Sequence, residues 1–328
     1  MVRASEPPRE RRQPHAVVIG AGFGGLAAAI RLGARGYRAT IFERLDGPGG
    51  RAYVYRQDGF TFDAGPTIVT APFLLEELWR LCGRRLADDV ELRPVSPFYR
   101  MHFDDGTVFD YCGDAAQVRA RIVKLSPGDL AGYERFLQKS ETIFRLGFEQ
   151  LAHVPFASWR DMVRIAPAML RLGNYRSIYG FVSRFVKDPR LRIALSFHPL
   201  LIGGNPFSAS SIYSLIVFLE RRWGVFFAMG GTGRLVQALA GLVDRQGGVI
   251  RYGAEVRSIL VKDRAAIGVR LASGEEVAAD IVVSNADSAW TYRYLLPAAV
   301  RPRATAPGSC RRGPGRRRKP SALPAAVA

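Results

Sequence analysis

The sequence has 328 residues and a formal net charge of +18. Hydrophobic residues account for 48% and charged residues for 23%, which excludes a globally disordered chain. Three cysteines are too few for a disulfide scaffold, and neither they nor the four histidines have the spacing of metal ligands, so we expect no metal site.

More than half of the excess positive charge lies at the two ends. Residues 1–14 hold four arginines against two glutamates, and residues 301–328 hold seven arginines and one lysine without an acid. The body of the chain is therefore only mildly basic, which argues against nucleic acid as a partner. Because both ends lack a periodic apolar pattern, we expect a disordered arm over 1–14 and a disordered basic tail over 301–328.

No targeting or membrane-spanning segment is expected. The N-terminus carries acids and three prolines among its arginines, and no plain apolar stretch follows it. The apolar stretches 193–204 and 212–219 are interrupted or shorter than the ~20 residues that a spanning helix needs. We therefore expect the protein to remain on the cytoplasmic side.

The first predicted elements form a strand–helix–strand unit. Residues 16–19 are a short apolar run typical of a buried parallel strand, and residues 26–32 contain strong helix formers. Residues 37–42 form a second apolar run, which ends at Glu43. The first strand and the helix are joined by the GxGxxG sequence of residues 20–25.

This order of elements predicts a dinucleotide-binding site. Gly20 permits a tight turn, Gly22 lets the backbone approach a pyrophosphate, and Gly25 lets the helix pack close to the sheet. The helix N-terminus then faces the phosphates, and Glu43 is placed to accept hydrogen bonds from ribose hydroxyls. An ordinary glycine-rich turn is the alternative.

A second glycine-rich segment follows at residues 46–51, with the sequence DGPGGR. Backbone N–H groups and a guanidinium there suit a cofactor whose pyrophosphate is held from two sides. A plain nicotinamide dehydrogenase rarely needs such a segment. A type II turn without a ligand is the alternative.

Residues 17–70 resemble the opening of the bacterial and fungal phytoene desaturases, which are FAD-dependent carotenoid desaturases related to the amine oxidase flavoproteins. The segments GGR at 49–51 and DAGPT at 63–67 carry much of the resemblance. It implies FAD contacts for Gly20, Gly22, Gly25, Glu43, Arg44, Gly49, Gly50 and Arg51, for Gly65, Pro66 and Thr67 near the flavin, and for the Val256 backbone near the adenine.

The fold class that follows is α/β: a Rossmann-like FAD-binding domain with an inserted α+β substrate domain. We predict the first part of the FAD-binding domain at 15–97, the substrate domain at 98–223 and the second part at 224–300. Glycines at 230–233, a helix to about Asp244 and short strands between 249 and 284 support the return to the cofactor domain.

Several elements of the middle region are also predicted. A helix is expected over 72–82, with Thr70 as its cap, and a hairpin over 99–111. The hairpin either forms one wall of a substrate cavity or has a purely structural role. A further apolar helix over 212–219 either lies in the core or lines an apolar channel.

Aromatic residues alternate with cations between Phe144 and Phe227, and acids are sparse there. Such a composition is typical of a surface lying in a membrane interface, although a cationic face over a core gives the same pattern. We expect contact with the inner face of the membrane as a peripheral protein. A lipophilic polyene, the substrate class that the resemblance implies, would reach the enzyme there without crossing water.

The resemblance ends near Pro297, where relatives continue with a further section, so we expect a shortened chain, with a natural basic tail as the alternative. The function that the resemblance implies is FAD-dependent desaturation of a phytoene-like polyene, with activity in doubt if that section is lost. The alternatives are another FAD-dependent oxidase of the superfamily and a non-catalytic fragment. No catalytic residue is assigned; Asp63 is the acid to test first, and a helix or loop role is its alternative.

Overall fold

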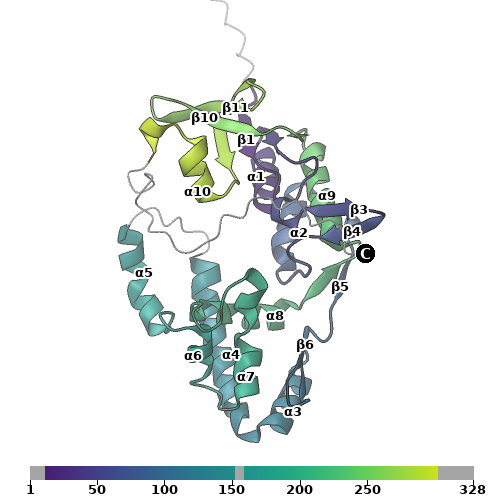
Figure 1. Ribbon diagram of the computed structural model, residues 1–328, viewed down its shortest axis with the longest axis vertical. Helices are drawn as coiled ribbons and strands as arrows, with labels where there is room; N and C mark the ends of the chain where they lie inside the picture. The colour runs from purple at the N-terminus through teal and green to yellow at the C-terminus, as the bar shows by residue number, and fades with distance from the viewer. Residues whose placement is uncertain (1–11, 152–158, 302–328) are drawn as a thin grey trace, which may run out of the picture. The chain divides into compact units, whose positions relative to one another are not determined.

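The computed structural model describes residues 12–151 and 159–301 (Figure 1), and it divides into two compact units. The first unit contains the chain up to Gly50 and from Leu239 onward, and the second contains Arg51–Ala238. The predicted functional domains, with boundaries after 97 and 223, do not coincide with these units and stay a prediction. Nearly all of the predicted disordered arm and tail lies outside the described residues.

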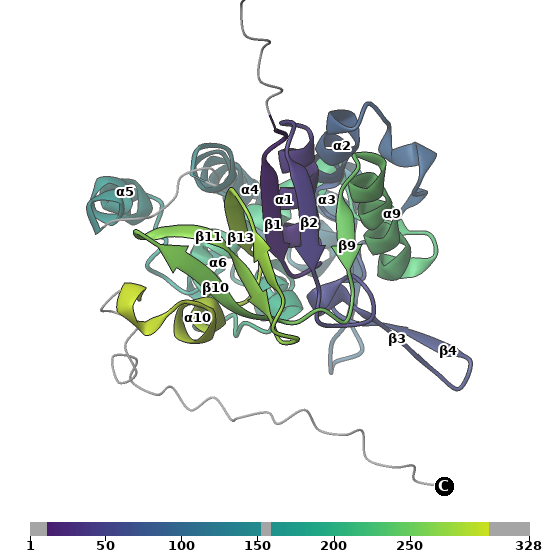
Figure 2. The same cartoon turned by 90° about the horizontal axis from the view of Figure 1, so that it is seen from above.

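The first unit is built on a parallel four-stranded sheet (Figure 2). Its strand order is β13 (Ile281–Ser284), β1 (His15–Ile19), β2 (Arg38–Phe42) and β9 (Val249–Arg251). The four strands confirm the apolar runs found in the sequence. Strand β1 is buried along its whole length, as a central parallel strand must be.

Helix α1 (Phe23–Gly33) packs against β1 and β2, and a second, antiparallel sheet packs near β13. This second sheet has the order β10 (Val256–Lys262), β11 (Ala265–Leu271) and β12 (Glu276–Ala278). Val17, Phe42 and Val256 meet in the core of the unit. The last described elements of the unit are α10 (Ser288–Trp290), a π-helical turn (Thr291–Leu295) and a 3₁₀ turn (Ala298–Val300).

The described residues of the second unit form three two-stranded antiparallel sheets. The predicted hairpin is confirmed as β6 and β7, and the other two pairs were not predicted. The strands are β3 (Val54–Gln57) with β4 (Phe60–Asp63), β5 (Leu92–Pro94) with β8 (Phe226–Ala228), and β6 (Tyr99–His102) with β7 (Val108–Tyr111).

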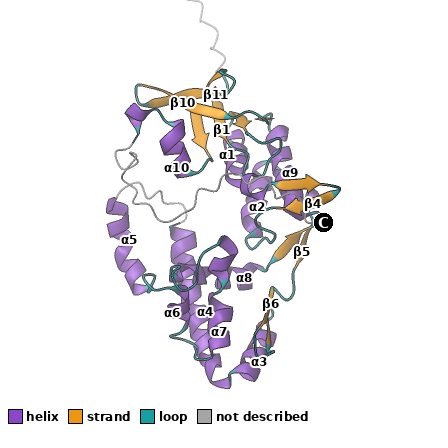
Figure 3. Ribbon diagram, in the orientation of Figure 1, coloured by secondary structure: helices purple, strands orange, loops and turns teal. Residues whose placement is uncertain are grey.

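Helices make up most of the second unit (Figure 3). Helices α4 and α8 pack against each other, and Phe136, Ile143 and Val217 lie in their shared core. Helix α9 starts in this unit and continues into the first. The helices are α2 (Pro72–Leu81), α3 (Ala115–Leu125), α4 (Leu130–Phe144), α5 (Trp159–Arg171), α6 (Ile178–Val182), α7 (Pro189–Ser196), α8 (Leu215–Trp223) and α9 (Gly231–Arg245).

Short helical turns connect these elements. The 3₁₀ turns are Gly50–Ala52 at the end of the second glycine-rich segment, Leu86–Asp88 after α2, Pro127–Asp129 before α4, His198–Ile202 after α7 and Ser211–Ser214 before α8. A π-helical turn, Arg145–Gln150, follows α4.

Two local predictions need correction. Helix α2 begins at Pro72 as expected, but its N-cap is Ala71 and no side chain caps it, so the prediction for Thr70 is wrong. Thr70 lies one residue too early, because only the N-cap side chain reaches the N–H groups of the first turn. The helix expected over 212–219 begins at Leu215, after a 3₁₀ turn, and extends to Trp223. In the described part of the chain, every helix is too short or too polar to cross a bilayer.

Candidate functional site

The glycine turn of the first unit connects β1 to α1. Gly20 has a φ of +92° and donates its N–H to the carbonyl oxygen of Phe42 at 2.8 Å, which ties the turn to β2. A Cβ atom on Gly25 would collide with the carbonyl oxygen of Gly20. Any larger residue at position 25 would therefore push α1 away from the strand that it follows.

The N-terminus of α1 has backbone N–H groups without a side-chain cap. Its N-cap is Gly22, no side chain caps it, and the first turn contains no acid. Free N–H groups and the positive end of the helix dipole favour an anion at such a position. The local chemistry therefore fits a phosphate group.

Glu43 follows β2 and is buried beside the glycine turn. Its Oε2 accepts the backbone N–H of Ala21 at 2.7 Å, and its Oε1 accepts that of Leu45 at 3.0 Å. Each carboxylate oxygen retains a second lone pair. The side chain is thus fixed in orientation and still has acceptors for the hydroxyl groups of a ribose.

The structure brings the second glycine-rich segment against the first. Gly49 forms a parallel β-bridge with Gly22 and donates its N–H to the carbonyl oxygen of Ala21 at 2.9 Å. A Cβ atom on Gly50 would lie 3.2 Å from the Cα of Gly22. The two glycine segments form one backbone cradle, whose width depends on the absence of side chains.

The remaining predicted residues of this unit lie near the same strand ends. Arg44 directly follows Glu43 and is exposed. Val256 is the first residue of β10, and it is buried in the same core cluster as Ile19 and Phe42. The contacts of both residues with a cofactor stay a prediction.

The other four predicted residues belong to the second unit. Arg51, Gly65, Pro66 and Thr67 are exposed, and a Cβ atom on Gly65 would collide with the carbonyl oxygen of Arg51. The carbonyl oxygen of Pro66 accepts the hydroxyl of Thr232. The contacts predicted between these four residues and a cofactor also stay a prediction.

Asn285 also lies at the glycine turn and was missed by the sequence analysis. It follows β13, the neighbour of β1 opposite β2, and its side chain lies against Gly22 and Gly24. The available signal was its position directly after the predicted strand 281–284. That signal does not suffice, since the sequence alone does not say which strand lies beside β1.

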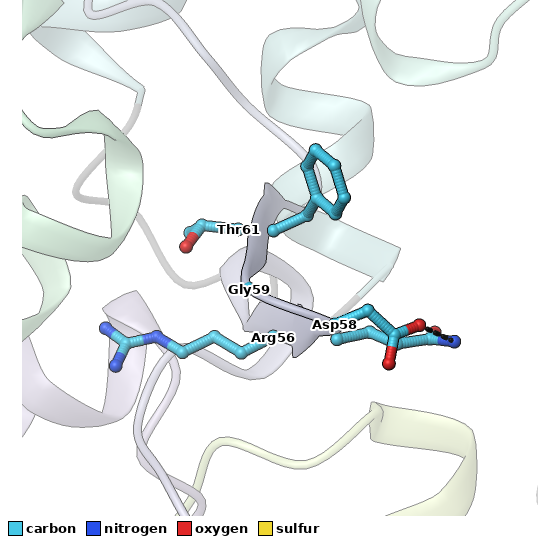
Figure 4. A pocket seen from close by; sticks show the side chains of 6 residues that line it. Arg56, Asp58, Gly59 and Thr61 are labelled. Atoms are coloured by element: carbon cyan, nitrogen blue, oxygen red, sulfur yellow. Dashed lines mark hydrogen bonds between the residues drawn. The ribbon is translucent and has the colours of Figure 1, made fainter.

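A separate hollow lies at the tip of the β3–β4 hairpin (Figure 4). It is lined by six consecutive residues, 56–61, and within it Gln57 donates to Asp58 at 3.3 Å. All six residues are exposed, and within 12–151 and 159–301 no group from another element lines the hollow. The hollow therefore lacks the enclosed, convergent character of a substrate site.

A parallel sheet with a glycine turn, an open helix N-terminus and an acid at the end of the next strand defines a Rossmann-like nucleotide-binding unit. A family model described as flavin containing amine oxidoreductase matches residues 23–302. The chain therefore belongs to the flavin-containing amine oxidoreductase family. This membership supports a flavin as the cofactor, and the cradle described above fits one.

Curated relatives are similar over most of the chain. A lycopene-forming phytoene desaturase of Pseudescherichia vulneris is 51% identical over 280 residues, which are 85% of this chain and 57% of that protein. A neurosporene-forming phytoene desaturase of Cereibacter sphaeroides is 47% identical over 281 residues, which are 86% of this chain and 54% of that protein. The chain thus spans little more than half the length of these relatives.

Solved structures share the fold. A redesigned putrescine oxidase has a TM-score of 0.61 at 16% identity, over 87% of this chain and 60% of that one. At this level of identity the similarity establishes the architecture alone. The α/β Rossmann-like class expected from the sequence is confirmed.

Proposed function

We propose that this protein binds FAD and desaturates a phytoene-like polyene in carotenoid biosynthesis. The observation that carries the proposal is the cradle of residues 20–25 with Glu43, in a chain 51% identical to a phytoene desaturase over 280 residues. The match at 47% identity to a second desaturase supports the same substrate class. The desaturase activity is proposed and does not follow from family membership, because the chain covers little more than half the length of each relative.

The diphosphate of FAD lies, in this proposal, against the N-terminus of α1, and Glu43 accepts the hydroxyls of the adenosine ribose. When bound, FAD supplies the hydride acceptor for oxidation of a carbon–carbon single bond beside the polyene. The other proposed contacts are Gly20, Gly22, Gly25, Arg44, Gly49, Gly50, Arg51, Gly65, Pro66, Thr67 and Val256.

The protein's own contribution is then orientation and the exclusion of water, since a hydrocarbon offers few groups for acid–base chemistry. Asp63 has no role as a base in this proposal. Both of its carboxylate oxygens accept backbone N–H groups at the start of α9, from Thr232 and Gly233.

Expression of residues 1–328 in cells that accumulate phytoene tests the proposal. We expect yellow or red cells and a purified protein that carries flavin, and Glu43→Ala should lower both the pigment and the flavin content. Colourless cells that contain flavin-loaded protein would contradict the desaturase activity. A purified protein without flavin would contradict the cofactor assignment as well.

We also propose that the protein contacts the cytoplasmic face of the membrane through the tip formed by residues 200–207. Leu200, Leu201, Ile202 and Phe207 are each more than half exposed, although water disfavours such side chains. Phe207 packs on Tyr179, with ring centroids 4.7 Å apart. Hydrocarbon would cover these four exposed side chains, which lie within eight residues of the chain.

The base of this tip is held inside the second unit. The 3₁₀ turn begins at His198, which is fully buried and lies with Nε2 3.1 Å from Oε2 of Glu220 on α8. Pro199 is buried next to it. His198 and Pro199 fix the start of the turn in the core, and the next three residues lie at the surface. This arrangement supports the proposal because it holds apolar side chains in an exposed position.

The charge of the surrounding chain supports an anionic bilayer as the partner. Residues 162–219 contain seven arginines and lysines and a single acid, Asp188. Asp188 is paired with Arg190 at 2.8 Å. Anionic headgroups attract such a cationic segment, and the apolar tip would then enter the boundary of the acyl chains.

Vesicle sedimentation tests the membrane contact. We expect binding to phosphatidylglycerol vesicles and much weaker binding to phosphatidylcholine vesicles. Serine at Leu201 and Ile202 together should lower the binding by about tenfold or more, since burial of each such side chain is worth about 1.5–3 kcal/mol. The matched control places serine at Val249 and Ile267 together, two exposed aliphatic residues of the first unit. Equal loss in both double variants, or no loss in either, would contradict the proposal.

A further inference from the structure

Asn285 stands at the carboxyl end of β13, where the parallel sheet presents its ligand-binding edge. Ser284, the last residue of β13, pairs with Ile19 of β1, and Asn285 donates its own N–H to the carbonyl oxygen of Ile19 at 2.9 Å. Ligands of open parallel sheets bind outside the carboxyl ends of the strands. The backbone of Asn285 is therefore fixed beside the start of the glycine turn.

The side chain of Asn285 lies against three glycines of this turn. Its Nδ2 is 3.0 Å from the position that a Cβ atom on Gly22 would take, and its own Cβ is 3.3 Å from the corresponding position on Gly25. Its Oδ1 occupies the space of a Cβ atom on Gly24. The three positions must lack side chains for the amide to lie where it does.

The amide has capacity for a ligand. Within the described residues, the Asn285 side chain makes no hydrogen bond to protein, and the residue is exposed. The adjacent N-terminus of α1 has no side-chain cap and no acid in its first turn. A neutral donor therefore lies beside free backbone N–H groups, and both are suited to the same anionic oxygens.

Asn285 and Glu43 flank the glycine turn from opposite sides. Strand β1 lies between β13 and β2, so the residues that follow these two strands border the turn on either side. Glu43 carries a negative charge, which suits hydroxyl groups, and Asn285 is an uncharged donor, which suits phosphate oxygens. The turn therefore has hydrogen-bond acceptors on one side, from Glu43, and an amide donor on the other, from Asn285.

We infer that Asn285 is a cofactor-binding residue that donates its Nδ2–H to the diphosphate of the dinucleotide. The inference rests on the proposed function for the identity of the ligand. It goes further in assigning a diphosphate contact to the residue that follows β13, outside both glycine segments.

Binding of ADP and of adenosine to the purified full chain tests the inference, because only ADP carries the diphosphate. Asn285→Asp places a negative charge beside the phosphates and should raise the dissociation constant for ADP by about tenfold or more, and that for FAD likewise. Asn285→Ala should raise it by about three- to tenfold. Neither variant should change the dissociation constant for adenosine.

The matched control is Gln138→Glu, which adds the same charge at an exposed position of α4 in the second unit and should leave ADP binding unchanged. Thermal unfolding without ligand shows that each variant is folded. An unchanged affinity of Asn285→Asp for ADP would overturn the inference, as would equal weakening of ADP and adenosine. If the unaltered chain binds neither ADP nor FAD, the proposed function itself fails, which is a distinct result.

Discussion

Asp63 and Thr232 lie 169 positions apart in the sequence, and the carboxylate of Asp63 accepts the backbone N–H of Thr232 at 2.9 Å. Its other oxygen accepts the N–H of Gly233 at 3.3 Å. Helix α9 begins at Gly231, so Asp63 satisfies two free donors of its first turn and opposes the positive end of its dipole. This geometry is that of a structural residue, which was the alternative that the sequence left open.

Replacement of Asp63 by alanine should lower the free energy of unfolding by about 0.5–2 kcal/mol, the usual effect of losing a side-chain cap. Asp63→Asn should lower it by less, because the amide oxygen still accepts one N–H. Urea unfolding of the purified chain measures both values. Wild-type stability in Asp63→Ala would show that the contact contributes nothing, and the acid would then need another role.

The strand–helix–strand unit was predicted from the sequence because its signals are local. Apolar runs, helix formers and glycine spacing each concern fewer than about 20 neighbouring residues. The sheet order β13–β1–β2–β9 was not predictable in the same way, since β9 and β13 come more than 200 residues after β1. Asn285 was missed for this reason.

The hairpin of β3 and β4 was missed for a different reason. Its local signal, the turn pair Asp58-Gly59 followed by the apolar and polar alternation of 60–63, was not used in the sequence analysis. Its aromatic residues Tyr55, Phe60 and Phe62 are exposed and contribute no core. The tie between β4 and α9 through Asp63 then holds the hairpin in place. Such a tertiary contact leaves no trace in local periodicity.

Gly25 should be among the least replaceable residues of the first unit. In Gly25→Ala the new Cβ would collide with the carbonyl oxygen of Gly20, and α1 must shift away from β1. We expect a loss of about 2 kcal/mol or more, or an insoluble protein. The control is Gly241→Ala on α9, where a Cβ meets open space and helix propensity should raise stability by about 0.5–1 kcal/mol. Equal stability of the two variants would contradict this packing.

Asp129 should contribute to the loss of stability in acid. Burial raises its pKa, but hydrogen bonds from the backbone of Asp188 and Lys187 and from Ser126 together lower it below the usual value. Because the pKa is lower in the folded state, the carboxylate stabilises the fold above the unfolded value of about 4, and this contribution is lost as the pH falls toward the folded value.

Asp129→Asn removes this titration. The difference in unfolding free energy between the wild type and this variant should be largest near neutral pH and should shrink as the pH falls below about 4. Urea unfolding at a series of pH values measures the difference. A difference that does not depend on pH would mean that the charge of Asp129 is unimportant.

Tyr99 should stabilise the buried pair of Glu220 and His198. Its hydroxyl donates to Oε1 of Glu220 at 2.6 Å, and burial, together with this carboxylate, raises the pKa of Tyr99, so the phenol keeps its proton. Tyr99→Phe leaves a fully buried carboxylate without one donor and should cost about 1–3 kcal/mol. Tyr55→Phe, at an exposed position, should change stability by less than about 0.5 kcal/mol. Similar values for both variants would refute the role assigned to the Tyr99 hydroxyl.

Titration of the purified chain with FAD tests the central claim most directly. The flavin fluorescence should change saturably to one FAD per chain, and ADP should compete. Glu43→Ala should weaken binding by about tenfold or more, whereas Glu43→Gln, which retains an acceptor for the Ala21 N–H, should weaken it less. Absence of saturable binding, or an unchanged affinity in Glu43→Ala, would contradict the nucleotide site built from the glycine turn and the end of β2.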